Sequence, residues 1–352
     1  MKTACLTAAK TIELREVSRP QAPADGLVMK MEACGICGSD LRRWQEGPPA
    51  GAPYIIQGHE LAGTVVETKS GVTGFKTGDR IAVAPDIHCG RCWYCRRGLF
   101  NLCPDLRLLG ITPGYDGGFA EYVHLSDEVL TNGIVHPMPD GLSFPEGALA
   151  ETLSSVLAAQ DHCRLTLGET LVVLGAGPIG CLHTVVGQVR GARVIVAELS
   201  PVRRRIVEQF QPDAVIDVTA RDVVSEVKRI TGGLGADVVI CANPVASTQT
   251  QAVEMSRRGG RIVLFGGLPK ANPMVSLNSN LIHYGEKVVM GAFSYHPSYH
   301  EEALQSLVRK VVPAEKLITH IRPLSRIGEA FQIASSGEAL KVMVVPDLPS
   351  EE

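Results

Sequence analysis

The feature that most constrains the fold is a glycine-rich turn between a strand-like and a helix-like segment. The apolar run TLVVLG (170–175) leads into GAGPIG (175–180), and residues 178–190 have the composition of a helix. Strand-like and helix-like runs continue to alternate beyond this point. Their unbroken stretches of Val, Ile and Leu are typical of strands buried on both faces of a parallel sheet that helices cover. The sequence therefore predicts a doubly wound α/β domain over residues 153–294.

The glycines of this turn match a dinucleotide-binding fingerprint. Gly175 would make the tight turn, Gly177 would let the backbone approach a pyrophosphate, and Gly180 would let helix and strand pack closely. The helix opens with Pro178 and Ile179, and its first turn directs free N–H groups and the positive end of its dipole toward the phosphates. We therefore expect a nicotinamide dinucleotide to bind here. A purely structural turn is the alternative.

An acidic residue and a run of arginines follow the fingerprint. Glu198 ends the strand-like run RVIVAE (193–198), eighteen residues after Gly180, which is close to the usual offset of about 20. Its carboxylate can accept hydrogen bonds from both ribose hydroxyls and would repel a 2′-phosphate, so NAD is favoured over NADP. Arg203, the first of three successive arginines, can stack on the adenine or meet a 2′-phosphate. NADP is therefore the alternative cofactor.

Four cysteines lie within fifteen residues of one another. They are Cys89, Cys92, Cys95 and Cys103. Four thiolates can close a tetrahedron around one ion, and such all-sulfur sites hold structural zinc with no position open for a substrate. An iron–sulfur cluster and free thiols are alternatives, but the last gap is seven residues, whereas the ferredoxin pattern has three. The sequence predicts a lobe over residues 86–105 that structural zinc holds in order.

Outside the α/β region, short strand-like runs are separated by Gly and Pro. This texture over residues 1–152 predicts an all-β module. Residues 295–352 contain one helix-like run and one strand-like run, which is too little for a domain. We therefore expect this last segment to return to the N-terminal module.

Charge and apolar runs restrict where the protein works. The net charge is −3 and no basic stripe is visible, so nucleic acid is not expected as a partner. No run reaches the ~18 apolar residues of a membrane span, and the N-terminus lacks the apolar core of a signal peptide. Most of the ten cysteines cluster as metal ligands would. These features together predict a cytoplasmic location without membrane association.

A second group of residues could hold a metal ion with one open position. Cys37 lies in CGICGSD (34–40), His59 and Glu60 follow Gly58, and Glu151 begins ETLS (151–154). Each is weak alone, because a lone Cys is more often a small buried apolar residue and a His beside Glu is more often a polar pair. Beside a dinucleotide domain, they form a set with the three protein ligands and the free position that catalytic zinc requires.

The chain resembles the zinc-dependent medium-chain alcohol dehydrogenases, particularly their sorbitol dehydrogenase-like polyol branch. The resemblance covers most of the chain and rests on motifs in family order, namely CGICGSD (34–40), GHE (58–60), the Cys89–Cys103 lobe, GGFAEYV (117–123), ETLS (151–154) and GAGPIG (175–180). It implies a GroES-like β-rich catalytic domain with a Rossmann domain. It also implies one catalytic and one structural zinc, NAD as cofactor, and a homodimer or homotetramer.

The resemblance further implies roles for the second group of residues. Cys37 and His59 would be zinc ligands, Glu60 and Glu151 would share the remaining acidic position, and Asp40 would orient His59 from behind. Zinc would act as a Lewis acid on the substrate oxygen while a hydride passes to the nicotinamide. This predicts the reversible oxidation of a secondary hydroxyl of a polyol or sugar derivative to a ketone.

The sequence departs from the family pattern at two places. Ser39 matches the residue whose hydroxyl takes the alcohol proton, but Arg42 stands where many relatives have a relaying His. A guanidinium stays protonated, so water or Glu60 would have to carry the proton away. Ser294 stands where the polyol dehydrogenases have Arg, which argues against sorbitol itself. Arg42 and Arg43 could recognise an anionic sugar derivative, or could be a solvated pair.

Two other functions are compatible with these residues. One is a threonine-type dehydrogenase of 3-hydroxy amino acids, which would share the fold. The other is a non-catalytic NAD-binding protein, against which the presence of Cys37, His59, Glu60 and Glu151 argues. The substrate itself cannot be named from the sequence.

Overall fold

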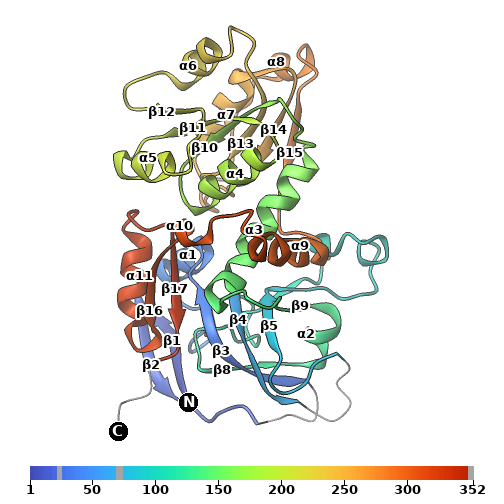
Figure 1. The fold of residues 1–352 in the computed structure, drawn as a ribbon, viewed down its shortest axis with the longest axis vertical. Helices are drawn as coiled ribbons and strands as arrows, with labels where there is room; N and C mark the ends of the chain where they lie inside the picture. Colours follow the sequence, from blue (N-terminus) through green and yellow to red (C-terminus); the bar gives the residue numbers. More distant parts are fainter. Residues whose placement is uncertain (22–25, 69–73, 348–352) are drawn as a thin grey trace. The chain divides into compact units, whose positions relative to one another are not determined.

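The computed structural model describes residues 1–21, 26–68 and 74–347 (Figure 1). The chain divides into two compact units. Unit 1 consists of residues 1–154 and 294–352, and unit 2 consists of residues 155–293. The expected boundaries, after residues 152 and 294, lie close to these divisions. The long helix α3 (Phe144–His162) contributes its first part to unit 1 and its last part to unit 2.

Unit 2 is built on a six-stranded sheet in the order β12-β11-β10-β13-β14-β15, in which all neighbours are parallel. The strands are β10 (Thr170–Leu174), β11 (Arg193–Glu198), β12 (Ala214–Asp217), β13 (Ala236–Cys241), β14 (Ser256–Leu264) and β15 (Val288–Gly291). The chain thus runs outward from β10 to one edge, then returns to the other side of β10. This is the strand order of the doubly wound nucleotide-binding fold and confirms the predicted fold class.

Helices connect these strands because a parallel sheet needs a crossover after each strand. They are α4 (Pro178–Val189), α5 (Pro201–Glu208), α6 (Val223–Ile230), α7 (Ala246–Met255) and α8 (Ser279–His283). The strand side chains are buried on both faces, as Val172, Val173, Val238 and Val239 illustrate. The unbroken apolar runs in the sequence reflect this two-sided burial.

Unit 1 contains a seven-stranded sheet in the order β16-β17-β3-β4-β5-β9, with β8 also paired to β3. The strands are β3 (Leu27–Gly35), β4 (Glu60–Thr68), β5 (Arg80–Ala84), β8 (Tyr122–Leu125), β9 (Ile134–Pro137), β16 (Ile318–Pro323) and β17 (Lys341–Val345). The last strand joins the first part of the chain, because Met343 pairs with Gly35 and Val344 with Cys34. Residues from the two ends of the sequence therefore share one sheet.

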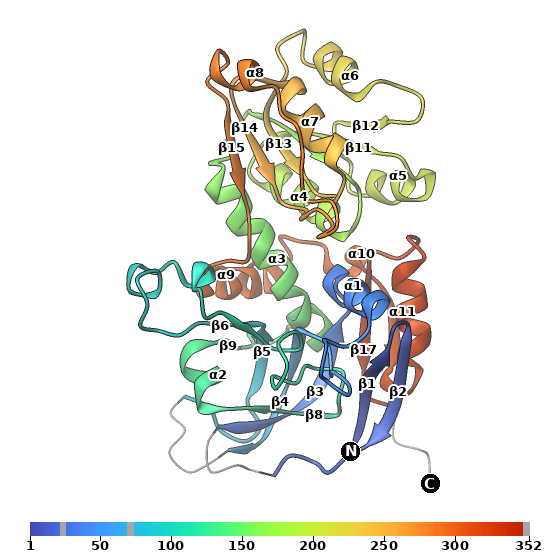
Figure 2. The same ribbon diagram turned by 180° about the vertical axis from the view of Figure 1, so that it is seen from behind.

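Smaller elements surround this sheet (Figure 2). They are the hairpin β1 (Lys2–Ala8) and β2 (Thr11–Glu16), the short pair β6 (Asp86–Ile87) and β7 (Arg107–Leu108), and helices α1 (Gly38–Glu46), α2 (Asp127–Asn132), α9 (Pro297–Val308), α10 (Ala314–Leu317) and α11 (Ile327–Ser335). Helix α11 packs on the sheet through Phe331, whose ring meets those of Phe119 and Trp44. The core of unit 1 therefore joins residues from both of its chain segments.

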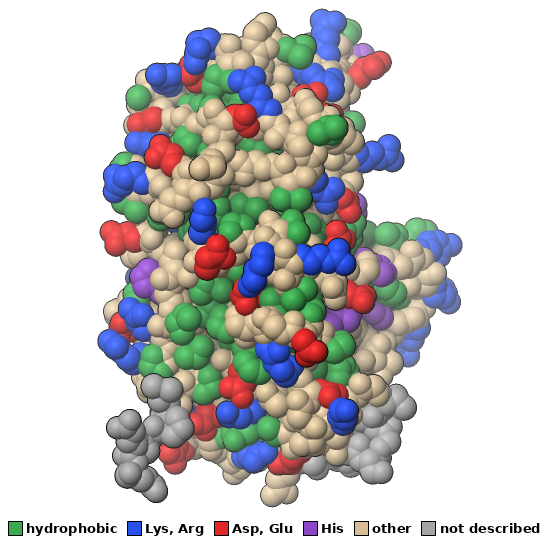
Figure 3. All heavy atoms as spheres, in the orientation of Figure 1, with side chains coloured by type: hydrophobic (Ala, Val, Ile, Leu, Met, Phe, Trp, Pro, Cys, Tyr) green, Lys and Arg blue, Asp and Glu red, His purple; other side chains and the backbone are tan. Residues whose placement is uncertain are grey.

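On the face seen in Figure 3, basic and acidic side chains are interspersed. Among the described residues, no helix combines the length and the apolar character that crossing a membrane requires.

Candidate active site and cofactor sites

Three of the four residues expected to hold the catalytic zinc converge in unit 1. The ligand atoms of Cys37, His59 and Glu60 all lie within 4.8 Å of one another. Cys37 is the N-cap of α1, directly after β3, whereas Glu60 begins β4. Because β3 and β4 pair with Gly35 opposite Glu60, the sheet brings the two segments to one point.

Glycines make room for this convergence. A Cβ on Gly35 would lie 2.0 Å from Glu60 Oε2, so any other residue here would displace the carboxylate. Gly58 has φ +98°, and a Cβ there would lie 2.7 Å from the sulfur of Cys34. The CGICGSD and GHE motifs are therefore constrained by packing as well as by chemistry.

Asp40 lies behind the cluster and fixes two of its members. It is 1% exposed, its Oδ2 accepts the backbone N–H of Cys37 at 2.9 Å, and its Oδ1 lies 3.6 Å from His59 Nδ1. Burial lowers the pKa of His59, but the charges of Asp40 and Cys37 outweigh it, so this pKa is well above its usual value. With Nδ1 facing Asp40, Nε2 is the nitrogen that faces Ser39, at 3.4 Å from its hydroxyl.

Thiolate, imidazole and carboxylate form a donor set that suits zinc. A His whose other nitrogen faces a carboxylate is the usual arrangement for a metal ligand, since the carboxylate fixes the tautomer. His59 Nδ1 is buried without a partner within hydrogen-bond distance, which a small approach toward Asp40 would correct. The residues present therefore fit a zinc ion held by Cys37, His59 and Glu60.

Lys341 enters the same cluster from β17. Its Nζ lies 2.6 and 2.7 Å from the two oxygens of Glu60 and 3.2 Å from the hydroxyl of Thr152. The side chains of Lys341 and Glu60 are 3% and 0% exposed. Burial lowers the pKa of Lys341, but Glu60 and Cys37 reverse this effect and raise it. The carboxylate is therefore compensated by a buried cation of the protein itself.

Glu151 lies near this cluster but is not within its ligand distances. It belongs to α3, and the Tyr295 hydroxyl donates to its Oε1 at 3.3 Å. Burial raises the pKa of Glu151 to about 7, although the charge of His59 opposes the shift. Of the two acids expected to share the remaining acidic position, Glu60 therefore has the geometry for direct contact and Glu151 is the more distant.

The four cysteines of the lobe also come together. Sulfur–sulfur distances are 3.4 Å between Cys92 and Cys95, and 4.0 Å both between Cys89 and Cys95 and between Cys92 and Cys103. Tetrahedral zinc with Zn–S bonds of about 2.3 Å requires edges of about 3.8 Å. A disulfide requires about 2.05 Å, and all ten cysteines are free. These distances fit a zinc ion that is fully enclosed by sulfur.

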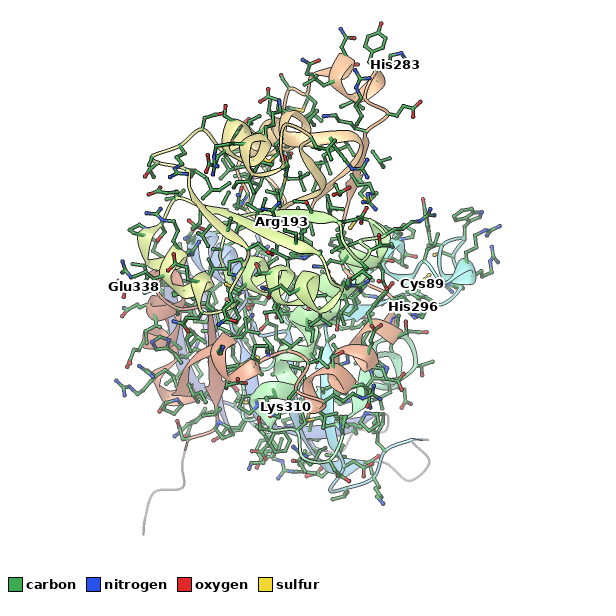
Figure 4. All side chains as sticks on the ribbon, turned by 45° about the horizontal axis from the view of Figure 1, so that its top comes forward. Cys89, Arg193, His283, His296, Lys310 and Glu338 are labelled. Carbon is green, nitrogen blue, oxygen red and sulfur yellow. The ribbon has the colours of Figure 1, made fainter. Side chains whose placement is uncertain are left out.

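Aromatic contacts connect the lobe to the start of α9, and Figure 4 labels Cys89 of the lobe and His296 at this helix start. The ring of Phe100 stacks on His88 with centroids 4.2 Å apart and lies 5.1 Å from that of His296. His296 is the N-cap of α9. The lobe itself leaves Trp93 and Leu102 about half exposed. Its order must therefore come from the sulfur cluster and this small stack.

The glycine-rich turn of unit 2 has the geometry that its sequence predicts. Gly175 follows β10 with φ +108°, and Gly177 is the N-cap of α4 with Pro178 in the first turn. A Cβ on Gly180 would lie 1.9 Å from the carbonyl oxygen of Gly175, so helix and strand approach too closely for a side chain. A Cβ on Gly177 would meet only Arg203 Nη1, at 3.9 Å, which leaves the turn open to a phosphate.

Glu198 ends β11 beside this turn. Its Oε2 accepts the N–H of Ala176 at 2.7 Å and its Oε1 accepts that of Ser200 at 2.8 Å. Each carboxylate oxygen can accept a further hydrogen bond, so ribose hydroxyls can still bind. Arg204 is engaged elsewhere, with Asp217 at 2.8 Å and the carbonyl of Leu199 at 2.6 Å.

Comparison with known proteins agrees with this geometry. The family model of the alcohol dehydrogenase GroES-like domain matches residues 23–140, and that of the zinc-binding dehydrogenases matches residues 178–309. Sorbitol dehydrogenase of Bacillus subtilis (strain 168) is 33% identical, over 99% of this chain and 98% of its own length. D-arabitol-phosphate dehydrogenase of Enterococcus avium is 30% identical, over 94% and 92%. The structure of a Sinorhizobium meliloti 1021 protein bound to NADP has a TM-score of 0.88 and 32% identity, covering 98% of this chain and 99% of that one.

The chain belongs to the zinc-dependent medium-chain alcohol dehydrogenases. The resemblance to the sorbitol dehydrogenase-like branch and the combination of a GroES-like with a Rossmann domain are thereby confirmed. This medium-chain dehydrogenase is a zinc-dependent oxidoreductase of the alcohol and polyol class.

Three buried residues near the candidate site were not singled out from the sequence. Lys341 is charged at the start of an apolar strand, KVMVV, and a lysine that begins a buried strand was the available signal. Asp86 and Tyr295 are buried polar residues whose partners, Ser294 and Glu151, come from distant parts of the chain. No local spacing connects these pairs, so pattern reading could not find them.

Proposed function

We propose that this dehydrogenase transfers a hydride from a secondary hydroxyl of a polyol or sugar derivative to NAD and so forms a ketone. The observation that supports this most directly is the cluster of Cys37, His59 and Glu60, which combines three zinc-type donors at one buried point. The same chain carries an open glycine-rich turn with an acidic residue beside it. Both parts of a nicotinamide-dependent alcohol dehydrogenase are therefore present.

The protein residues of the metal site would divide the work among them. Cys37, His59 and Glu60 would hold the ion and leave one position for the substrate, while Glu151 would share the acidic position, as a water-mediated ligand. When bound, zinc supplies Lewis-acid polarisation of the alcohol oxygen and NAD supplies the hydride acceptor. Asp40 keeps the imidazole of His59 oriented, with its Oδ1 3.6 Å from Nδ1.

Ser39 would receive the proton that the alcohol loses. It lies in the first turn of α1, two residues after Cys37, and its hydroxyl is 3.4 Å from His59 Nε2. Arg42 lies one turn further along α1 and is exposed, and its guanidinium cannot act as a base. Proton transfer from Ser39 would therefore pass to water, because Glu60 would already be shared between the ion and Lys341.

NAD would be preferred over NADP. Glu198 is 6% exposed beside the turn and places negative charge where a 2′-phosphate would lie. Arg204, which could have offset this charge, is ion-paired with Asp217. Arg203 approaches Gly177 and would contact the cofactor from the phosphate side. Replacing Glu198 by Ser should therefore lower kcat/KM with NAD. It should also lower the ratio of kcat/KM with NAD to kcat/KM with NADP.

Metal removal tests the proposed function. Purified protein depleted of its more labile zinc with a chelator should lose NAD reduction with polyols and regain it on adding zinc. A panel of polyols, sugar acids and hydroxy amino acids would identify the substrate class, and preference for threonine would favour the amino-acid dehydrogenase instead. NAD binding without turnover of any substrate by zinc-loaded protein would contradict the proposal and support a non-catalytic role.

We also propose that the protein forms a homodimer or homotetramer. Light scattering would measure the oligomeric state.

A further inference from the structure

A buried carboxylate close to the metal cluster has no role in the function described so far. Asp86 begins β6, immediately after Pro85, and is 6% exposed. Its Oδ2 accepts a hydrogen bond from the hydroxyl of Ser294. Within residues 1–21, 26–68 and 74–347, no lysine or arginine pairs with Asp86, and its Oδ1 has no hydrogen-bond partner.

Other buried acids of the protein are compensated more fully. Glu60 is held by Lys341, Glu198 accepts two backbone N–H groups, and Asp40 accepts the N–H of Cys37 and faces His59. Asp86 has a single neutral hydroxyl. Burial raises the pKa of Asp86 to about 6, against the lowering effects of Ser294 and His59, so the group is mainly ionised at pH 7–8. A buried anion with one neutral partner is the kind of group that a cationic ligand would stabilise.

Two consecutive residues connect Asp86 to the metal cluster. The Ser294 hydroxyl binds Asp86, and the Tyr295 hydroxyl binds Glu151 at 3.3 Å. Against the larger effect of burial, the charge of His59 lowers the pKa of both Asp86 and Glu151, and the charge of Asp86 raises the pKa of Glu151. Ser294 has φ +51°, a conformation that non-glycine residues rarely adopt, and strain of this kind is typical of functional sites.

We propose that Asp86, oriented by Ser294, is a specificity-determining residue that binds a protonated amino group of the substrate. The preferred substrate is then an amino alcohol or amino polyol whose amine lies near the hydroxyl that is oxidised. This inference rests on the proposed dehydrogenase function. An ammonium group offers three donors to the free Oδ1 of Asp86, whereas a neutral hydroxyl offers one.

The same charges would exclude an anionic substrate from this position. Asp86 would repel a carboxylate or phosphate, and Lys341 is engaged by Glu60. Of the two arginines of α1, Arg43 lies 3.5 Å from Glu46 and is partly neutralised, and Arg42 is exposed. The expected order of preference is therefore amine, then neutral polyol, then sugar acid.

Three compounds with the same six-carbon chain test this order on the zinc-loaded enzyme with NAD. Glucamine carries an amine at the end where D-glucitol carries a hydroxyl and D-gluconate a carboxylate. The kcat/KM for glucamine should exceed that for D-glucitol by about tenfold or more, since a charge-assisted hydrogen bond contributes roughly that much. Equal or better turnover of D-glucitol or D-gluconate would overturn the inference and leave the proposed function intact. Turnover of none of these, nor of any other alcohol, would overturn both.

Variants of the pair separate a specificity role from a structural one. Asp86→Asn keeps the shape and removes the charge, so the ratio of kcat/KM for glucamine over D-glucitol should fall to about one, mainly through KM. Asp140→Asn is the matched control, because Asp140 is an exposed acid of the same unit and its loss should leave the ratio unchanged. Glucamine should also raise the melting temperature of the wild type with NADH and have a smaller effect on Asp86→Asn.

A second variant keeps the test valid if Asp86→Asn does not fold. Ser294→Arg would provide Asp86 with an internal cation in place of the substrate amine, so the preference for glucamine should disappear and turnover of D-gluconate should rise relative to D-glucitol. Circular dichroism would establish that the variant is folded. An unchanged ratio in folded Ser294→Arg and in folded Asp86→Asn would show that Asp86 does not select the substrate.

Discussion

The two metal regions of unit 1 differ in how the chain assembles them. The lobe takes four thiolates from a single stretch, Cys89 to Cys103, and these thiolates lie close enough together to enclose an ion completely. The catalytic cluster takes Cys37 from the end of β3, His59 and Glu60 from the start of β4, and a compensating Lys341 from β17. The first depends on local spacing, and the second depends on the register of a whole sheet.

This difference separates stability from chemistry. A closed set of four like ligands has no free position and can only hold a loop in place. In the mixed set, the negative charge of Glu60 is balanced by Lys341 even when the metal is absent. We therefore expect the catalytic cluster to survive metal loss better than the lobe does.

The largest expected effect is on catalysis. Cys37→Ser should reduce kcat/KM by at least about a thousandfold, equivalent to about 4 kcal/mol of barrier, because the ion loses its thiolate. Zinc content should fall by one per chain while the lobe keeps its own. The matched control is Cys5→Ala, a buried cysteine of β1 outside both metal regions, whose activity should stay within a fewfold of wild type. Wild-type turnover of Cys37→Ser would remove the assigned role of this thiolate.

The next effect concerns the buried ion pair. Lys341→Met should destabilise the metal-free protein by about 3–5 kcal/mol, because Glu60 would remain buried without a cation. Added zinc should restore part of this loss, so the zinc-induced rise in melting temperature should be larger in the variant than in wild type.

Lys310→Met is the control for this pair, since Lys310 binds Glu146 at the surface with 62% of its side chain exposed. Its loss should change stability by less than about 1 kcal/mol. An identical response to zinc in Lys341→Met and wild type would mean that Lys341 does not substitute for the ion.

Loss of a cysteine from the lobe should affect stability more than activity, which is the reverse of the effect expected for Cys37→Ser. Cys103→Ser should lower stability by about 3 kcal/mol through loss of the structural ion, with activity reduced much less than in Cys37→Ser. Hydrogen exchange over residues 86–105 should rise, because this segment has few buried apolar side chains of its own. Unchanged exchange would indicate that the stack of His88, Phe100 and His296 is sufficient to order the lobe.

The smallest expected effect is on the pH dependence of stability, for which two buried histidines of unit 1 differ. His59 faces Asp40, which raises its pKa, whereas burial lowers the pKa of His300 to about 3, and its Nδ1 faces His136 Nδ1 at 2.9 Å. The folded state therefore favours neutral His300. Its contribution to stability is complete above the unfolded pKa of about 6.5 and is lost progressively as the pH falls toward 3.

This loss should amount to about 2 kcal/mol between pH 8 and pH 5. Denaturant titrations across that range would measure it, and His300→Gln should show a shallower dependence on pH. Burial also lowers the pKa of His136, although Glu301 opposes this, so a remaining slope in the variant is expected from this neighbour. Equal slopes in both proteins would contradict the assignment.

The sequence predicted the parts of this molecule that are encoded locally. The doubly wound sheet follows from apolar runs that alternate with helices, the nucleotide turn from GAGPIG, and the sulfur lobe from four closely spaced cysteines. In each case the partners are neighbours in the chain or repeat with a fixed period. Such signals survive without any knowledge of tertiary structure.

The catalytic cluster could be predicted only in part. Cys37, His59 and Glu60 were identified through family motifs, but Lys341 lies 281 residues from the Glu60 that it binds. The pairing of Asp86 with Ser294 spans 208 residues. These contacts depend on strand order and on the return of the chain to unit 1, which no local pattern specifies.

Because β17 pairs with β3, the sheet of unit 1 cannot be completed until β17 has been synthesised. A ribosome that adds about 5–20 residues per second needs roughly 15–60 s to pass from Glu60 to Lys341. Throughout that interval the Glu60 carboxylate lacks its lysine partner. All of unit 2 leaves the ribosome in the same interval and becomes free to fold. The nucleotide-binding half of the enzyme can therefore fold before β17 joins the sheet that carries the metal cluster.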